Sequence, residues 1–125
     1  AADIPARLDN RLSGVGVTLG GAAAGGLQRI ADVPIYFADA TVRRAASLQR
    51  TADARAPRAL VSSATAAAAG LAGTSRVRVS QGTGAAVLDL AIDDTLPVNC
   101  VRVSAAHATT AALGAMFGPI TVERA

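Results

Sequence analysis

The chain has 125 residues, enough for one domain with a modest core, and half of its residues are hydrophobic, many of them alanine. All twelve basic residues are arginine, and nine acidic residues leave a net charge of +3, which is compatible with docking on an acidic protein surface. One tyrosine, two phenylalanines and no tryptophan offer few stacking platforms, and Arg43-Arg44 is the one adjacent arginine pair, so we expect no nucleic-acid binding.

Cysteine content and hydropathy set further limits. Cys100 is the single cysteine, which rules out an intramolecular disulfide and makes an iron–sulfur cluster held by this segment alone nearly impossible. No stretch approaches the roughly 20 apolar residues of a membrane span, so we expect no direct membrane insertion. The chain begins at Ala1 without a signal-peptide pattern, and we expect it to be a fragment of a longer protein.

The first 32 residues are rich in glycine and alanine. Six glycines fall between Leu12 and Gly26. Glycine loses the most backbone entropy on ordering, so we expect residues 1–32 to be a flexible lead-in and residues 33–125 to form the folded domain.

Residues 33–58 open the expected domain. Residues 33–37 are predicted to be a short extended piece. Asp39 is suited to cap a helix that runs through Thr41 to Leu48, with arginines away from its apolar side. Pro57 then separates this helix from the main block.

A strand and a short helix come next. Residues 58–62 read as a strand, and Ser62 or Ser63 can cap a helix over residues 64–69. Gly70 suits the left-handed position after the helix, and Leu71 can make the hydrophobic contact that follows it. The side chains expected to face inward are those of Ala64, Ala67, Ala68 and Leu71.

Two alternating segments, 76–79 and 87–92, predict a hairpin. If Gly82 and Thr83 form a type II′ turn, Val79 lies opposite Ala86, Val77 opposite Leu88 and Arg76 opposite Asp89. Apolar then meets apolar and positive meets negative, so both faces of the hairpin agree on this register.

The remaining elements follow in short steps. We expect a loop over residues 93–99, in which Asn99 takes a positive φ, and a strand over residues 100–103. A short helix over residues 108–113 and a final strand over residues 120–123 complete the chain. The expected core consists of Leu60, Val61, Leu71, Val77, Val79, Leu88, Leu90, Ile92, Val101, Val103, Leu113, Phe117, Ile120 and Val122.

Few residues carry recognisable chemistry. His107 is the single histidine and has no nucleophile or carboxylate at a telling spacing, which favours a structural or loop-capping role over general-base catalysis. Cys100 is interpreted as a small buried hydrophobe rather than a reactive thiol. The adjacent Asp93-Asp94 pair indicates a loop edge more than a metal site. Residues 82–84 lack the lysine of a phosphate-binding loop, so the hairpin interpretation holds there. We therefore expect no catalytic, cofactor-binding or metal-binding residue.

The order of the motifs resembles the molybdopterin-dinucleotide-binding domain, which ends many molybdenum and tungsten oxidoreductases. The resemblance rests on the alanine-rich helix, Gly-Leu pair, alternating strand and glycine turn of residues 66–82, and on the Val-x-Val strand and histidine corner of residues 101–107. It implies a mainly β fold with short helices, a double-psi β-barrel.

A narrower resemblance is to the C-terminal domain of the large iron–sulfur subunit of bacterial NADH:quinone oxidoreductase, respiratory complex I. It rests on residues 30–39 and 42–49, on residues 106–119, and on the short ending 122–125. This resemblance implies a structural, docking domain that supports electron transfer from NADH to quinone without chemistry of its own. The alternative is a cofactor-binding domain of a molybdenum oxidoreductase, which would cover the nucleotide tail of the cofactor.

The narrower resemblance also implies surroundings and partners. Its iron–sulfur clusters would lie upstream in the parent subunit, with no cofactor in this fragment. Its partners would be other domains of its own subunit and neighbouring complex I subunits. Its location would be peripheral, on the cytoplasmic side of the bacterial inner membrane. At the corner of residues 105–107, alanines stand where pterin-binding relatives tend to carry glycine or polar groups.

Overall fold

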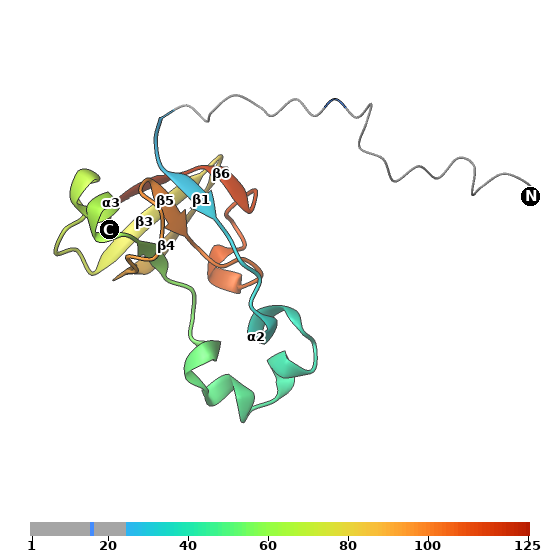
Figure 1. The fold of residues 1–125 in the computed structure, drawn as a ribbon. Coiled ribbons are helices and arrows are strands. Elements are labelled where there is room, and N and C mark those ends of the chain that lie inside the picture. Colours follow the sequence, from blue (N-terminus) through green and yellow to red (C-terminus); the bar gives the residue numbers. More distant parts are fainter. Residues whose placement is uncertain (1–15, 17–24) are drawn as a thin grey trace, which may run out of the picture.

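The computed structural model describes Gly16 and residues 25–125, which form a curled, mainly β sheet with short helices (Figure 1). The strands of these described residues lie in the order β6-β1-β5-β2-β4-β3-β7. They are Gln28–Ile30 (β1), Ala59–Val61 (β2), Arg76–Gln81 (β3), Gly84–Ile92 (β4), Cys100–Arg102 (β5), Phe117–Pro119 (β6) and Thr121–Arg124 (β7). The helices are Ile35–Ala38 (α2), Val42–Arg44 (η1), Leu48–Arg50 (η2), Ala52–Ala54 (η3), Ser63–Ala68 (α3) and Ala108–Thr110 (η4).

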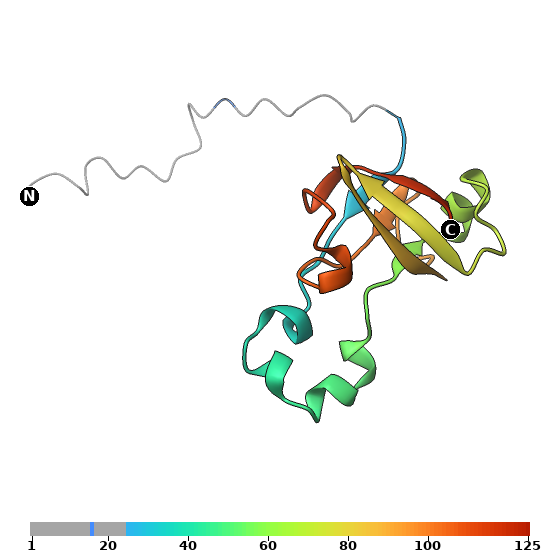
Figure 2. The ribbon, with the colours of Figure 1, turned by 180° about the vertical axis from the view of Figure 1, so that it is seen from behind.

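The sheet is mixed and strongly curled. β1 runs parallel to β5 and β2 runs parallel to β4, while the other neighbouring strands are antiparallel. The two edge strands, β6 and β7, are separated in sequence by Ile120 alone, so both edges of the sheet meet in one chain segment (Figure 2). Gly118 of that segment pairs with Arg29, and Val122 pairs with Val79. The expected mainly β fold with short helices is confirmed, and its finer assignment as a double-psi β-barrel stays a prediction.

The core fills the inside of the curl. On β3, Val77 and Val79 are fully buried while Arg76 and Arg78 are exposed, as alternation on a half-buried strand requires. Burying a side chain of this size contributes roughly 1.5–3 kcal/mol. The core consists of Ala59, Val61, Ala66, Leu71, Val77, Val79, Ala86, Leu88, Val101, Val103, Leu113, Ile120 and Val122.

The prediction that Ile92 and Phe117 belong to the core is wrong. Ile92 is 53% exposed and Phe117 is 63% exposed. Ile92 is the last residue of β4 and Phe117 is the first residue of the edge strand β6, so both lie at the rim of the sheet. Leu60 and Leu90 are only partly buried.

The β3–β4 hairpin has the expected register. Val79 lies opposite Ala86 and Val77 opposite Leu88, and the turn begins at Gly82 with a φ of 57°. Gly84 has a separate reason to be glycine, because a Cβ atom there would lie 1.7 Å from the carbonyl oxygen of Ala112.

Helix α3 has the expected ends. The Ser62 hydroxyl accepts a hydrogen bond from the amide of Thr65, and Gly70 takes a φ of 67°. The amide of Leu71 then donates to the carbonyl of Ala66 at 2.8 Å, which closes the helix. The expected inward face was wrong except for Leu71, because Thr65 and Ala66 are the buried residues of the helix. The hydroxyl of Thr65 explains this rotation, since it bonds both Ser62 and the amide of Asn99.

Residues 33–58, which connect β1 to β2 along the chain, form a lobe that projects from the sheet (Figure 1). The expected extended piece is partly helix α2. The single helix expected through Thr41 to Leu48 is wrong, because that segment holds the separate turns η1 and the start of η2, and η3 follows. Asp39 still caps the first turn, since its Oδ1 accepts from the amides of Thr41 and Val42 at 2.8 Å each. Phe37 and Pro57 are the buried residues of the lobe, so no apolar face sustains a longer helix there.

The first strand lies inside the segment expected to be a lead-in. β1 pairs with both β5 and β6, and it buries the side chain of Arg29. Ordered structure therefore begins before residue 33. Apart from Gly16, the part of the lead-in that precedes Gly25 lies outside the described residues.

Candidate functional site

A hollow of about 440 Å³ lies between the outer face of the sheet and the lobe. The sheet supplies Leu60, Arg102 and Ser104, together with Asp32 just after β1. The lobe supplies apolar side chains, two arginines, Arg55 and Arg58, and the carboxylate of Asp53. The remaining lining residues are Pro34, Ile35, Tyr36, Phe37, Ala52, Ala56 and Pro57.

Strand register explains why these side chains meet. Ala59, Val61, Val101 and Val103 are fully buried on the core side, so the alternate residues of the same segments face outward. Leu60 lies opposite Arg102 in the antiparallel β2–β5 pair. Continuing this register brings Arg58 opposite Ser104 at the same end of the pair.

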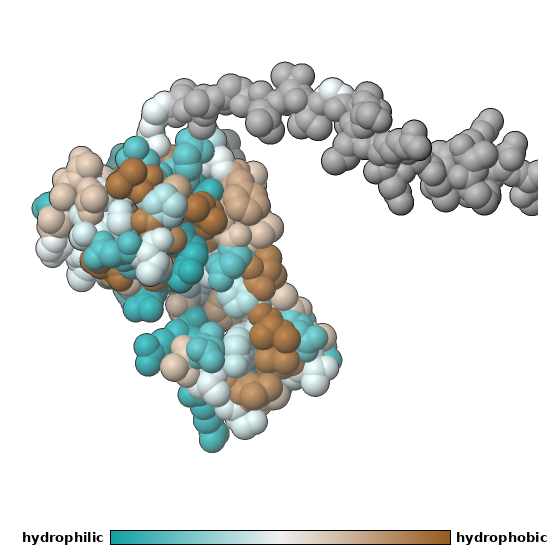
Figure 3. All heavy atoms as spheres, viewed as in Figure 1, coloured by the Kyte–Doolittle hydropathy of each residue, from teal (hydrophilic) through white to brown (hydrophobic). Residues whose placement is uncertain are grey.

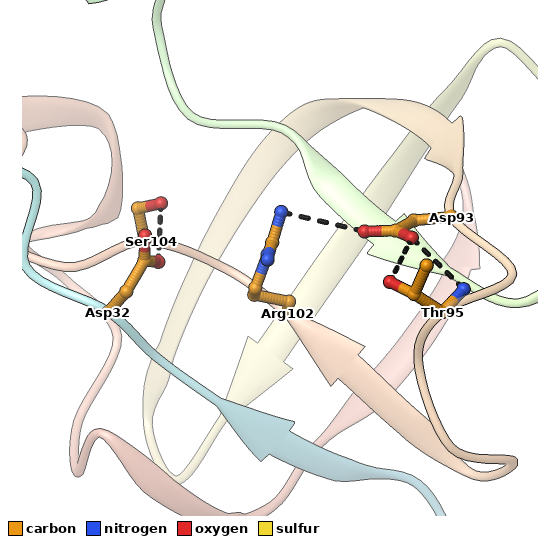
Figure 4. Close-up of polar contacts among 5 residues, drawn as sticks. All are labelled: Asp32, Asp93, Thr95, Arg102 and Ser104. Atoms are coloured by element: carbon orange, nitrogen blue, oxygen red, sulfur yellow. Dashed lines mark hydrogen bonds and ion pairs between the residues drawn. The ribbon is translucent and has the colours of Figure 1, made fainter. Parts of the chain in front are cut away.

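The parallel β1–β5 pair places Asp32 beside Ser104, at the end of the sheet where Arg58 also lies. Ile30 lies beside Arg102, so Asp32 and Ser104, two residues further on, also lie side by side. The Ser104 hydroxyl donates to Asp32 Oδ1 at 2.7 Å, and the amide of Ala105 donates to the Asp32 carbonyl at 2.8 Å (Figure 4). This contact fixes the hydroxyl and the carboxylate at the edge of the hollow.

The side chain of Arg102 points away from the Asp32–Ser104 contact and toward Asp93. Its Nη2 lies 3.5 Å from Asp93 Oδ2, and the side chain and amide of Thr95 both donate to Asp93 Oδ1 (Figure 4). Hydrogen bonds from Thr95 first, and the charge of Arg102 in addition, hold the pKa of Asp93 below its ordinary value. Asp93 is thus an ionised anchor that orients Arg102.

Arg55 and Arg58 are the uncommitted cations of the hollow. Both side chains are exposed, and neither has an ion-pair partner among the described residues. Guanidinium groups bind phosphate and carboxylate through paired N–H donors. With Ser104 and Asp32 at the rim and apolar side chains beneath, the hollow suits an anionic ligand with a flat or apolar part.

His107 and Cys100 lie away from this hollow. The imidazole Nδ1 of His107 accepts from the Thr109 amide at 3.2 Å and lies 2.8 Å from the Thr109 hydroxyl, which caps η4. Its ring packs edge-on against Phe37 with the ring centres 4.8 Å apart, and so ties the lobe to the sheet. This is the loop-capping role that the sequence favours. Cys100 is half-buried rather than buried, because it stands at the start of β5 beside the exposed Asn99.

The other singled-out residues have local roles. Asp94 Oδ1 accepts from the Ser63 amide at 2.7 Å, so it supports the start of α3. That bond lowers the pKa of Asp94. Asn99 takes the expected positive φ of 61°. Within the described residues, no three His, Cys, Asp or Glu side chains gather as metal ligands would.

Sequence reasoning missed Arg29, the largest fully buried side chain of the described residues. Its Nη1 donates to Gln81 Oε1 at 2.9 Å and to the Ala115 carbonyl at 3.1 Å, and its Nη2 donates to the Val103 carbonyl at 3.3 Å. Its Nε has no partner, and burial lowers the pKa of the guanidinium. No carboxylate is among its hydrogen-bond partners within the described part of the chain, so carbonyl dipoles hold this cation.

Its position was hard to predict. The segment Leu27 to Ile30 shows no alternation, and an arginine is rarely buried without a partner of opposite charge. The converging arginines at the hollow were missed as well, because they stand 44 to 47 positions before Arg102 in the sequence. Their proximity follows only from the register of the paired strands, which the sequence does not reveal.

Comparisons with known proteins add a structural likeness. No protein-family model matches the chain, and no curated protein matches it. Among solved structures, the chain is similar to acetylene hydratase from Pelobacter acetylenicus, with 22% sequence identity over 65% of this chain and a TM-score of 0.44. The chain spans 11% of the length of that structure's chain. Among the described residues, even helix α3 has six residues, so none of the helices there could span a membrane.

Proposed function

We propose that this chain is a binding domain of the molybdopterin-dinucleotide type, which covers the nucleotide tail of the cofactor in a larger oxidoreductase. The presence of two exposed arginines, Arg55 and Arg58, in one hollow beside Arg102 is the observation that carries the proposal. The resemblance of residues 66–82 and 101–107 to that domain family supports it, as does the curled, mainly β sheet. The double-psi topology of this sheet is part of the same proposal.

The residues fit the phosphate part of such a group. Arg55 and Arg58 are free to pair with a pyrophosphate, while Asp93 holds Arg102 to one side. The Asp32 carboxylate can accept hydrogen bonds from a sugar or base. When bound, the cofactor would supply the redox chemistry of the parent enzyme, and this chain would supply binding and orientation only.

The test is a calorimetric titration of the chain with guanosine diphosphate, which carries a nucleoside and a pyrophosphate. We expect saturable micromolar binding to the wild type. Arg58→Gln should weaken it about tenfold or more, since hydrogen bonds to charged groups contribute about 1.5–3 kcal/mol and about 1.4 kcal/mol is tenfold.

Arg78→Gln is the matched control, because Arg78 is also an exposed arginine beside a strand but lies outside the lining of the hollow. Its binding should equal that of the wild type. Equal weakening in both variants, or no saturable heat in the wild type, would contradict the proposal.

The second candidate function is a docking domain of the complex I large subunit, without a bound cofactor. The charge of the lobe favours it, because residues 33–58 hold five arginines and two aspartates. In that case the iron–sulfur clusters lie upstream, and the chain belongs to a peripheral arm on the cytoplasmic side of the bacterial inner membrane. The same titration separates the two candidates, since this one expects no nucleotide binding.

A further inference from the structure

The lobe of residues 33–58 carries the whole net charge of the protein. Its five arginines and two aspartates give +3, and the rest of the chain holds seven arginines and seven acidic residues. The sheet region is therefore balanced while the lobe is basic. Such an uneven distribution favours contact between the lobe and an acidic surface.

The arginines of the lobe divide into two groups. Arg55 and Arg58 line the hollow, whereas Arg43, Arg44 and Arg50 lie on η1 and η2 and are exposed. None of these three has an ion-pair partner among the described residues. They are thus available to a partner that does not occupy the hollow.

Apolar side chains accompany this charge. Val33 is 47% exposed, Ile35 is 58% exposed and Leu48 is 39% exposed. Figure 3 shows hydrophobic side chains along one side of the lobe, on the part of the molecule below the sheet. Apolar side chains beside exposed cations are typical of an interface with a protein, where an apolar centre is ringed by charge.

The lobe keeps its shape with little core. Gln49 Nε2 donates to the carbonyls of Tyr36 and Val42, both at 3.1 Å, and Asp39 caps η1. Phe37 packs on His107 and anchors the lobe to the sheet. Burial of Phe37 and Pro57 alone offsets little of the conformational entropy that is lost when this segment is ordered. Covering the exposed apolar side chains would therefore stabilise the lobe.

We propose that the lobe is a docking element for an acidic protein surface with an apolar centre, on another domain or subunit of the parent assembly. This inference goes beyond nucleotide binding and does not depend on it. A membrane surface fits less well, because the helices of the lobe have three or four residues and no tryptophan is present. Nucleic acid fits less well, because Tyr36 and Phe37 are the aromatic residues of the lobe and Phe37 is buried.

The test places a photoreactive benzoylphenylalanine at position 48 of the chain, within its full parent protein and natural assembly. After irradiation, the adduct is identified by mass spectrometry. We expect one dominant protein peptide that is rich in Asp and Glu and contains apolar residues. An adduct to lipid, to nucleic acid or to residues 1–24 of the same chain would overturn the proposal, as would the absence of a defined adduct.

Charge variants complete the experiment. Combined Arg43→Gln and Arg44→Gln substitutions should lower the adduct yield about tenfold, as expected for two partly exposed charge pairs. Combined Arg76→Gln and Arg78→Gln substitutions remove the same charge from β3 and should leave the yield unchanged. An equal loss in both double variants would also overturn the proposal.

The docking test and the nucleotide test can fail separately. Arg43 and Arg44 do not line the hollow, so their replacement should leave guanosine diphosphate binding as in the wild type. Retained nucleotide binding with lost crosslinking assigns the defect to the lobe.

Discussion

The curled sheet and the lobe reach a defined shape by different physical means. The sheet surrounds thirteen buried apolar residues, including fully buried valines on β2, β3 and β5. The lobe buries Phe37 and Pro57, and it depends on capping and amide hydrogen bonds at Asp39 and Gln49. A core makes unfolding cooperative, whereas exposed hydrogen bonds open locally. The sheet should therefore set the global stability, and the lobe should open on its own.

The largest expected effect is in the sheet, at Arg29. Arg29→Ala leaves Gln81 and the carbonyls of Val103 and Ala115 without their donor in a buried place. Leaving a buried acceptor without its donor typically costs about 1–3 kcal/mol, and the cavity left by the missing side chain adds to that loss. We expect a loss of that size in the free energy of unfolding, measured by urea denaturation.

The control for Arg29 is Arg78→Ala, on the exposed face of β3. This change should stay within about 0.5 kcal/mol of the wild type. If Arg29→Ala were equally mild, carbonyl dipoles would not be stabilising the buried guanidinium.

A smaller global effect is expected in the lobe, at Gln49. Gln49→Ala removes two hydrogen bonds that join η2 to α2 and to η1, each of which contributes about 0.5–1.5 kcal/mol locally. We expect faster amide exchange in residues 36–50, with a change in global unfolding below about 1 kcal/mol. Arg50→Ala, next to it, should leave exchange unchanged. A fall in global stability as large as that of Arg29→Ala would show that the lobe and the sheet unfold as one unit.

The smallest effect is a pH dependence at the sheet loop of residues 93–99. The pKa values of Asp93 and Asp94 are lowered by hydrogen bonds from Thr95 and Ser63 respectively. Their stabilising effect is therefore present above the unfolded-state pKa of about 3.9 and is lost as pH falls through the lower folded-state pKa.

Thermal melting between pH 6 and pH 2, in steps of roughly one unit across that range, checks this. The wild type should lose stability below about pH 4, and the double variant Asp93→Asn with Asp94→Asn should lose less over the same interval. A variant that follows the wild-type curve would assign the acid sensitivity to other carboxylates.

The sequence by itself determined the features that depend on neighbouring residues. The register of the β3–β4 hairpin follows from alternation and one glycine turn, the ends of α3 follow from Ser62 and Gly70, and the positive φ of Asn99 follows from its place in a loop. Backbone sterics, capping and cross-strand pairing operate over a few residues, so their signals are legible along the chain.

Only the tertiary structure decided what depends on distant contacts. The pairs β1–β5 and β2–β5 join strands far apart in sequence. The first lies at the strand that buries Arg29, and the second gathers Arg58, Arg102 and Ser104 at one rim. The alternation of apolar and polar residues shows which side chains of a strand share a face. It does not show which other strand pairs with that strand. The lobe lacks its expected helix because it has no apolar surface to pack against. Helix propensity alone then sustains only single turns.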